Sequence, residues 1–184
     1  MRIISGENRG RKLAQIEGWD IRPTADRVRE AIFNILGPTI RQARVLDIFA
    51  GTGALGLEAL SRGAASAVFV ESAPASCKAI TENINRCKKE DKALLLKQDA
   101  TRLPYPLPMD QKDKFDLVFM DPPYDKGLVD NILTQEAFFT LLAPGARVMV
   151  EQSTKEPPVK TPAGLDIYRQ KKYSKTRVTI FNAV

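Results

Sequence analysis

The chain has 184 residues, a formal net charge of +6, no histidine and two cysteines. The missing histidine excludes the commonest general base and the histidine-dependent serine and cysteine hydrolases. Without histidine, the two cysteines do not supply the ligand set of a typical zinc site, and we expect no metal. No apolar run has the length of a membrane span and no signal peptide opens the chain, so we expect a cytoplasmic protein that contacts no membrane.

The pattern of apolar residues predicts alternating strands and helices along the chain. Two short strands at 2–5 and 11–16 flank a glycine-containing turn, and a helix then runs to the Gly37-Pro38 stop signal. A strand begins at residue 45. Beyond it the pattern predicts strands at 67–71, 93–98, 115–120 and 147–152, helices at 55–62, 75–89 and 128–142, and a final pair of strands at 166–173 and 177–182.

This order of elements predicts an α/β fold. Strands that alternate with helices form a mostly parallel sheet with helices on both faces, and the last two strands add an antiparallel hairpin, giving a Rossmann-like sheet of seven strands. We expect a single domain over residues 1–184, in which a small β-hairpin extension (1–20) precedes the core (21–184).

The positive charge is concentrated at the two ends of the chain. Residues 1–44 carry nine Lys/Arg and five Asp/Glu, residues 165–184 carry five and one, and residues 45–164 carry fourteen and sixteen. Basic flanks around a near-neutral centre fit a polyanionic partner, although they are also compatible with a merely solvated surface. The residues predicted to bind this partner are Arg2, Arg9, Arg11, Lys12, Arg22, Lys171, Lys172 and Lys175.

A glycine-rich turn connects the strand at residue 45 to the next helix. Gly51 and Gly53 permit positive φ and a close approach of ligand to backbone, and Gly56 completes a G-x-G-x-x-G spacing. That spacing suits a nucleotide-like ligand, but Asp47 would repel a pyrophosphate and attract a cation. S-adenosylmethionine (SAM) carries a sulfonium and an ammonium group and no phosphate. The segment resembles the first motif of SAM-dependent methyltransferases, whose fold also ends in an antiparallel hairpin.

Three further acids, Glu71, Asp99 and Asp121, follow later strands of the predicted sheet. Because ligands of such sheets bind at the carboxyl ends of the strands, we expect these acids to lie at one edge. Glu71 would accept hydrogen bonds from the ribose hydroxyls, and Asp99 would accept one from the adenine amino group beside the Ala100 amide. The residues predicted to bind the cofactor are Asp47, Phe49, Gly51, Thr52, Gly53, Glu71, Ser72, Asp99, Ala100 and Asp121.

The sharpest motif is Asp121-Pro122-Pro123-Tyr124, directly after the fourth strand of the core. The two prolines fix the backbone and leave the Pro122 carbonyl free of ladder pairing. The Asp121 carboxylate and this carbonyl would both accept hydrogen bonds from one exocyclic amine, and Tyr124 would stack on the base. Asp121, Pro122 and Tyr124 are therefore the predicted catalytic residues. A rigid proline turn capped by an aspartate is the purely structural alternative.

Taken together, these motifs resemble the RsmD family of bacterial enzymes, which methylate a guanine N2 in 16S ribosomal RNA. The segments Arg22-Pro23-Thr24 and 28–34 (VREAIFN) contribute to the resemblance, which covers nearly the whole chain. It implies a SAM-dependent methyltransferase with S-adenosylhomocysteine as product, and 16S rRNA, the small ribosomal subunit or an assembly intermediate as partner. We expect a monomer. The chain departs from the family at Ser174, where a glycine is expected in the last hairpin.

Three other functions remain open at this stage. An adenine-N6 methyltransferase acting on DNA or RNA would use the same motif, since its target is also an exocyclic amine. A nicotinamide-dependent oxidoreductase would fit the glycine spacing, although Asp47 counts against it. A ribosome-binding module without catalysis would fit the charge distribution, although the acids and the motif at 121–124 count against it.

Overall fold

The computed structural model describes residues 1–16, 23–108, 114–124 and 126–184. Its strands are β1 (Arg44–Ile48), β2 (Ser66–Glu71), β3 (Ala93–Lys97), β4 (Phe115–Met120), β5 (Leu142–Ser153), β6 (Leu165–Tyr173) and β7 (Thr176–Ala183). Its helices are α1 (Pro23–Leu36), the 3-10 helix η1 (Gly37–Ile40), α2 (Ala54–Ser61), α3 (Pro74–Cys87), α4 (Leu128–Leu133) and α5 (Glu136–Phe139). The predicted α/β architecture is confirmed.

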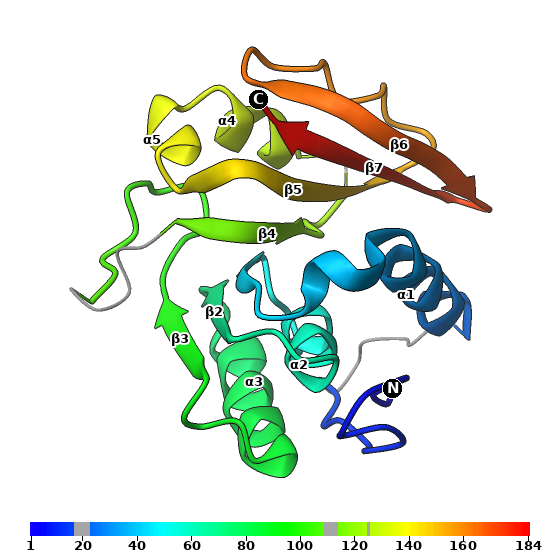
Figure 1. The fold of residues 1–184 in the computed structure, drawn as a ribbon, viewed down its shortest axis with the longest axis vertical. Helices are drawn as coiled ribbons and strands as arrows, with labels where there is room; N and C mark the ends of the chain where they lie inside the picture. Colours follow the sequence, from blue (N-terminus) through cyan, green and yellow to red (C-terminus); the bar gives the residue numbers. More distant parts are fainter. Residues whose placement is uncertain (17–22, 109–113, 125) are drawn as a thin grey trace.

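All the strands form one seven-stranded sheet in the order β3-β2-β1-β4-β5-β7-β6, with β3 and β6 at opposite ends (Figure 1). Strands β1 to β5 pair in parallel, whereas β7 runs antiparallel to β5 and β6 antiparallel to β7. The central strands are continuous apolar runs because parallel strands are buried on both faces. The predicted mostly parallel sheet with a C-terminal antiparallel hairpin is confirmed.

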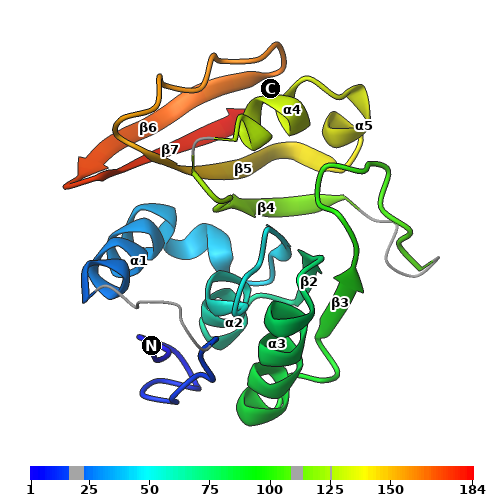
Figure 2. The same cartoon turned by 180° about the vertical axis from the view of Figure 1, so that it is seen from behind.

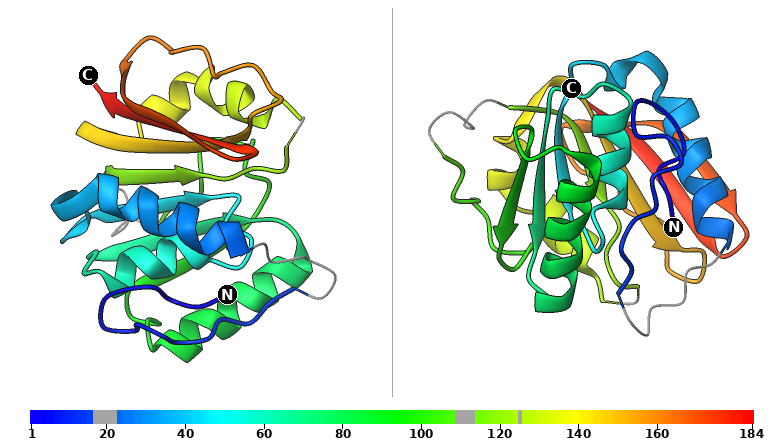
Figure 3. Two further views of the ribbon diagram at one scale, coloured as in Figure 1. Left: turned by 90° about the vertical axis from the view of Figure 1, so that its right-hand side faces the viewer. Right: turned by 90° about the horizontal axis from the view of Figure 1, so that it is seen from below.

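Helices cover both faces of the sheet (Figures 2 and 3). On one face, α1, α2 and α3 build a buried cluster with the sheet side chains Phe69 and Phe119, and the rings of Phe33 and Phe119 lie 5.6 Å apart. On the other face, α4 and α5 pack on a second cluster that contains Ile132 and Met120. Side chains alternate between the faces along each strand, so one residue of shift would exchange the two clusters.

The C-terminal hairpin turns within two residues although its first turn residue is serine. Tyr173 pairs with Thr176, and Ser174 has a φ of 54°. This left-handed conformation favours glycine and is strained for a residue with a Cβ atom. Glycine, which the family pattern has at this position, would adopt this conformation without strain, and with serine the hairpin still pairs Tyr173 with Thr176.

The predicted N-terminal β-hairpin is not seen. The segment at 1–16 forms a loop closed by the single antiparallel bridge between Arg2 and Lys12. Three backbone hydrogen bonds cross this loop, from Ile3 to Arg11, Gly10 to Ile3 and Leu13 to Met1, and they do not extend into a ladder. Amides that face away from this pairing donate to side chains of the core: Ile4 to Glu58 and Ala14 to Asn83.

The single helix predicted at 128–142 is also wrong, because two short helices, α4 and α5, occupy this segment. The Thr134 hydroxyl donates to the carbonyls of Asp130 and Asn131, and Gln135 is extended, so the helix is interrupted there. The Pro144-Gly145 pair lies within β5, where the register of this strand to β4 shifts. No helix in the described part of the chain has the length and apolar character needed to cross a membrane.

A buried carboxylate anchors the N-terminal segment (residues 1–16) to α2. Glu58 is fully buried, and its two oxygens accept the amides of Ile4 and Ser5 at 2.7 and 3.0 Å. Arg62 donates to the same carboxylate at 2.7 Å. Such a buried charge is tolerated only because its lone pairs are occupied, so the side chain couples α2 to the N-terminal segment.

We expect Glu58→Ala to destabilise the fold by about 3–5 kcal/mol, since it leaves buried donors without their acceptor. The matched control is Glu82→Ala, because Glu82 and Arg86 form a pair of the same spacing that is 46% and 42% exposed. The control should cost at most about 0.5 kcal/mol. Urea unfolding of both variants measures the difference, and equal losses would contradict the anchoring role.

Candidate active site

Four acids line up where neighbouring strands of the sheet end. Asp47 pairs in register with Phe69 on β2 and with Phe119 on β4, and Phe119 pairs with Met149 on β5. The residue two places beyond each partner projects to the same face of the sheet. The acids brought together in this way on the face covered by α1, α2 and α3 are Asp47, Glu71, Asp121 and Glu151.

The glycine turn has the backbone conformation that the sequence predicts. Gly51 and Gly53 have φ angles of 57° and 75°, and the Gly53 amide donates to the Ala50 carbonyl at 2.7 Å. Phe49 also adopts a positive φ, 62°, which is rare for a bulky side chain and marks strain at functional turns. The turn therefore presents backbone rather than side chains at the carboxyl edge of the sheet.

Gly56 has a packing role that differs from the role of the turn glycines. A Cβ atom at this position would lie 2.4 Å from the Phe69 ring and 3.2 Å from the Asp47 carboxylate. The absence of a side chain lets α2 lie directly on β1 and β2. The third glycine of the motif thus serves close contact between helix and strand.

Asp47 lies behind the turn and holds the start of α2. Its side chain is 1% exposed, and its Oδ2 accepts the Gly56 amide at 2.9 Å. This amide is one of the first of α2, which otherwise lack partners within the helix, and Gly53 offers no capping side chain. Burial, with a smaller contribution from the charge of Glu71, raises the pKa of Asp47 to about 7, against the opposing effect of the Gly56 hydrogen bond.

Glu71 connects the glycine turn to the start of α3. One carboxylate oxygen accepts the Gly51 amide at 3.0 Å, and the other accepts the amides of Ser72 and Ala73 at 2.8 Å each. A carboxylate has about four acceptor positions, so Glu71 retains capacity for a ligand hydroxyl. Glu71 lies two residues beyond Phe69, the register partner of Asp47, which keeps it at the same edge of the sheet.

Asp99 follows β3 and is exposed. Its Oδ1 accepts both the amide and the hydroxyl of Thr101, at 2.9 and 2.8 Å. These hydrogen bonds lower the pKa of Asp99 below its ordinary value. The neighbouring Ala100 is buried, and its carbonyl accepts the Tyr105 hydroxyl at 2.7 Å. The turn after β3 is therefore held in one conformation beside the other acids.

The segment 121–124 places an acid and an aromatic ring directly after β4. The Tyr124 hydroxyl donates to Glu151 Oε1 at 3.1 Å and lies 3.4 Å from the Thr176 hydroxyl. Desolvation, and then the negative charges of Glu151 and Asp47, raise the pKa of Asp121 well above its ordinary range. The Asp121 side chain is nevertheless exposed, so protein groups surround this acid on one side and solvent contacts it on the other.

Glu151 is the site residue that sequence reasoning missed. It lies in the interior of β5, within a segment predicted simply as a strand. Burial raises the pKa of Glu151, whereas hydrogen bonds from Tyr124 and Thr176 oppose that shift. The signal that was available is that β4 and β5 both change from an apolar run to an acid, at Asp121 and Glu151, at the same level of the sheet. Within the described residues, these acids form no group of three placed to hold a metal ion.

The basic residues predicted to bind the polyanion form two exposed groups. The N-terminal group is Arg2, Arg9, Arg11 and Lys12, and the C-terminal group is Lys171, Lys172 and Lys175. Arg22 lies outside the described residues.

The C-terminal group adjoins the carboxyl edge of the sheet, whereas the N-terminal segment reaches it only near Ala14, because its turn at 6–10 lies against the C-terminal ends of α2 and α3. At the C-terminal group, Ser153 at the end of β5 pairs with Thr176, whose hydroxyl approaches Tyr124. At the N-terminal group, the Asn83 amide donates both to the N-terminal segment and to the Thr52 carbonyl of the glycine turn. Of the two groups, the C-terminal lysines therefore lie beside the site, and the turn of the N-terminal segment lies towards the opposite edge of the sheet.

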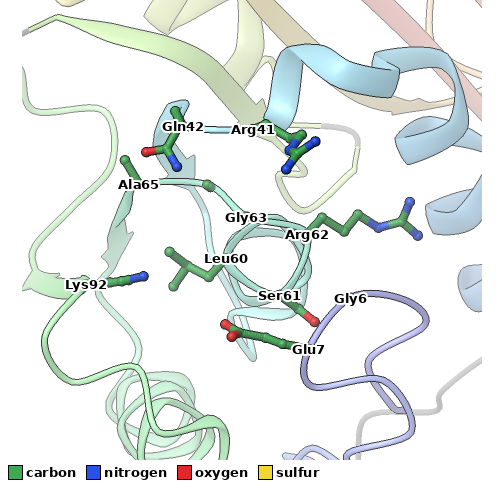
Figure 4. Close-up of a pocket in the computed structure, with 11 residues that line it drawn as sticks. Gly6, Glu7, Arg41, Gln42, Leu60, Ser61, Arg62, Gly63, Ala65 and Lys92 are labelled. Atoms are coloured by element: carbon green, nitrogen blue, oxygen red, sulfur yellow. The ribbon is translucent and has the colours of Figure 1, made fainter.

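A cavity of about 480 Å³ lies at the opposite edge of the sheet (Figure 4). Ala65 and Lys92 in its lining directly precede β2 and β3, and Gln42 lies two residues before β1. These positions are the amino ends of the strands, where α/β sheets do not bind their ligands. The cavity contains none of the aligned acids and is separate from the candidate active site.

The strand order, the glycine turn backed by an acid and the loop at 121–124 define a methyltransferase. The chain belongs to the family described as Conserved hypothetical protein 95, whose model matches residues 1–182. The ribosomal RNA small subunit methyltransferase D of Escherichia coli strain K12 is 38% identical over 172 residues, which are 93% of this chain and 84% of that protein. The predicted membership of the RsmD family is confirmed.

Two solved structures support the fold. The structure of yhhF from Escherichia coli has a TM-score of 0.85 at 35% identity and covers 100% of this chain and 97% of that chain. The 16S rRNA N2 G1207 methyltransferase RsmC of Thermus thermophilus, solved with AdoMet and guanosine, has a TM-score of 0.66 at 21% identity. The latter likeness covers 91% of this chain and 44% of that chain, and it concerns the fold alone.

We expect Asp47→Asn to gain stability relative to the parent as pH rises from about 4 to about 7. Asp47 has a pKa of about 7 when folded and an ordinary value near 3.8 when unfolded. Between these values the folded parent retains a proton that the unfolded chain has lost, so its stability falls as pH rises. Asparagine does not titrate, and its oxygen still accepts the Gly56 amide.

Urea unfolding at pH 4, 5.5, 7 and 8 measures this difference, which should reach a few kcal/mol and level off above about pH 7. The exposed residue Asp130 provides the control substitution, Asp130→Asn. A constant difference between Asp47→Asn and the parent at all four pH values would show that Asp47 does not titrate with folding.

Proposed function

We propose that this methyltransferase transfers a methyl group from SAM to the exocyclic N2 amine of a guanine in 16S rRNA of the small ribosomal subunit. The observation that carries the proposal is the position of Asp121. It follows β4 on the same sheet face as the glycine turn and is flanked by Tyr124. The names of the relative from Escherichia coli and of RsmC support an RNA substrate.

The residues of the edge fit SAM in charge and shape. The turn offers backbone at Gly51 and Gly53, which allows close approach, and the acids Asp47 and Glu71 stand beside it. A cationic ligand without phosphate meets complementary charge there, whereas a pyrophosphate would meet repulsion. In this proposal Glu71 holds the ribose hydroxyls and Asp99 the adenine amine. Bound SAM would supply the electrophilic methyl group.

Asp121 and the Pro122 carbonyl orient the acceptor amine. Both accept hydrogen bonds from its N–H groups, which directs the nitrogen lone pair toward the methyl carbon. Positive charge would develop on the nitrogen as it takes up the methyl group. The ionised Asp121 carboxylate would stabilise this charge, and the extra proton would then pass from the amine to solvent. Tyr124 supports the base by stacking, which requires that the nucleotide is unpaired or flipped out.

The basic residues would guide the RNA backbone to this amine. Lys171 on the edge strand β6 pairs with Val178, which in turn pairs with Glu151. These three residues form one row across the hairpin on the face of the sheet that carries the site. RNA that places its target at Tyr124 would therefore pass over β6, where Lys171 and Lys172 are exposed.

The principal alternative is an adenine-N6 methyltransferase, because Asp121 and the Pro122 carbonyl would orient either amine. Nucleoside analysis after radiolabelled methyl transfer separates the two targets. Small subunits from a strain without the enzyme are the substrate, and N2-methylguanosine is the expected product. Label in N6-methyladenosine would overturn the assignment of the base but not the chemistry.

Asp121→Ala should lower the single-turnover rate by at least about 10²–10³-fold, because the variant loses an interaction that is strongest in the transition state. SAM affinity by calorimetry should remain within about twofold, since this acid acts mainly on the amine. Asp130→Ala, which removes an exposed acid of α4, is the control. Near-normal methylation by Asp121→Ala would exclude the mechanism.

Replacement of Lys171 and Lys172 by glutamine should weaken RNA binding and reduce its salt dependence. Each lost phosphate contact lowers the log–log slope by about 0.7 for single-stranded RNA. The matched control replaces Lys88 and Lys92, two exposed lysines between α3 and β3, and also removes two charges. Equal slopes for the two double variants would mean that these β6 lysines are only a solvated surface.

A further inference from the structure

The proposed chemistry leaves the role of Glu151 unexplained. Glu151 is half-buried on β5, and a carboxylate at such a position is costly unless it has partners. Its partners are the Tyr124 hydroxyl at 3.1 Å and the Thr176 hydroxyl, which itself lies 3.4 Å from the Tyr124 oxygen. The two groups that contact this buried acid therefore come from the catalytic loop and from the C-terminal hairpin.

The hydroxyl contact decides how the Tyr124 ring is oriented. A ring that only stacked on a base would need no hydroxyl, and phenylalanine would serve equally well. Here the Tyr124 hydroxyl donates a hydrogen bond to the Glu151 carboxylate in the central sheet. The pairing of Met120 with Val150 sets the register of β4 and β5 just before Asp121 and Glu151. The hydrogen bond thus connects Tyr124, at the end of the segment 121–124, to β5. This strand is the neighbour of β4, after which the segment begins.

We propose that Glu151 is a positioning residue, which fixes the plane of the Tyr124 ring through the tyrosine hydroxyl and so sets the position of the target base relative to Asp121. This inference rests on the proposed function, and it assigns a role to a residue that touches no reacting atom. Thr176 completes the arrangement from β7, so the hairpin that carries the basic residues also contributes to the order of the loop.

The charge of Glu151 has a second consequence for the same loop. The charged groups that face Asp121 are Glu151 from β5 and Asp47 from β1. Both disfavour ionisation of Asp121, so the catalytic rate should rise with pH as Asp121 loses its proton. Removal of the Glu151 charge without loss of its hydrogen-bonding oxygen should therefore move this limb of the pH–rate profile to lower pH.

Single-turnover methylation of small subunits with four variants tests the inference: Tyr124→Phe, Glu151→Ala, the double variant of these two, and Glu151→Gln. Tyr124→Phe and Glu151→Ala should each lower the rate about tenfold to a hundredfold. The double variant should be no slower than the slower single variant, because both changes remove one interaction. Glu151→Gln should keep most of the rate at its optimum and shift the acidic limb to lower pH.

A second readout does not depend on activity. With 3-fluorotyrosine in place of the four tyrosines, the signal lost in Tyr124→Phe identifies Tyr124 in the fluorine NMR spectrum. This signal should shift and sharpen in Glu151→Ala and should stay nearly unchanged in Glu151→Gln.

Additive rate losses in the double variant would overturn the inference. A fluorine signal of Tyr124 that does not change in Glu151→Ala would also overturn it. If the parent protein methylates guanine N2 and the Glu151 variants behave as the parent, the inference alone fails. If the parent does not methylate the subunit, the proposed function fails, and the fluorine spectra still decide whether Glu151 holds the ring.

Discussion

The hydrogen bond from the Gly56 amide to the buried Asp47 carboxylate fixes the position of the glycine turn on the sheet. It replaces a helix cap at the start of α2, and it is possible only because Gly56 has no side chain between the helix and Phe69. With α2 in this position, the turn between β1 and α2 has little freedom, and the Gly51 amide meets Glu71. One contact between strand and helix thus sets the geometry of the cofactor edge.

The parallel register then decides which acids meet. Side chains alternate along every strand, so the acids two residues beyond Phe69, Phe119 and Met149 share one face with Asp47. Burial of these carboxylates, and to a smaller extent the repulsion between them, raises the pKa values of Asp47 and Asp121. The site is therefore electrostatically strained without ligand and complementary to a cation.

The sheet, the glycine turn and the loop at 121–124 could be predicted because each leaves a local signal: an apolar run, a glycine pair or a proline pair. Glu151 gives no local signal of this kind. An acid inside a strand can be recognised as a site residue only when the register between the strands places it beside Asp121. The N-terminal hairpin was wrong for a related reason. Its amides donate to Glu58 and Asn83, which lie far away in the sequence, and local periodicity contains no information about such partners.

The docking of the N-terminal segment also sets an order of events during synthesis. The segment is made first, but Ala14 finds its acceptor 69 residues later, at Asn83 in α3. A growing chain therefore exposes the apolar side chains of Ile3 and Leu13, which are buried in the finished core, until α3 has left the ribosome. Contacts between such distant residues form slowly because a long loop must close first. Ile4 and Ser5 can find Glu58 once α2 is made, but the completion of α3 is the earliest moment at which the Ala14 end of the segment can settle beside the glycine turn.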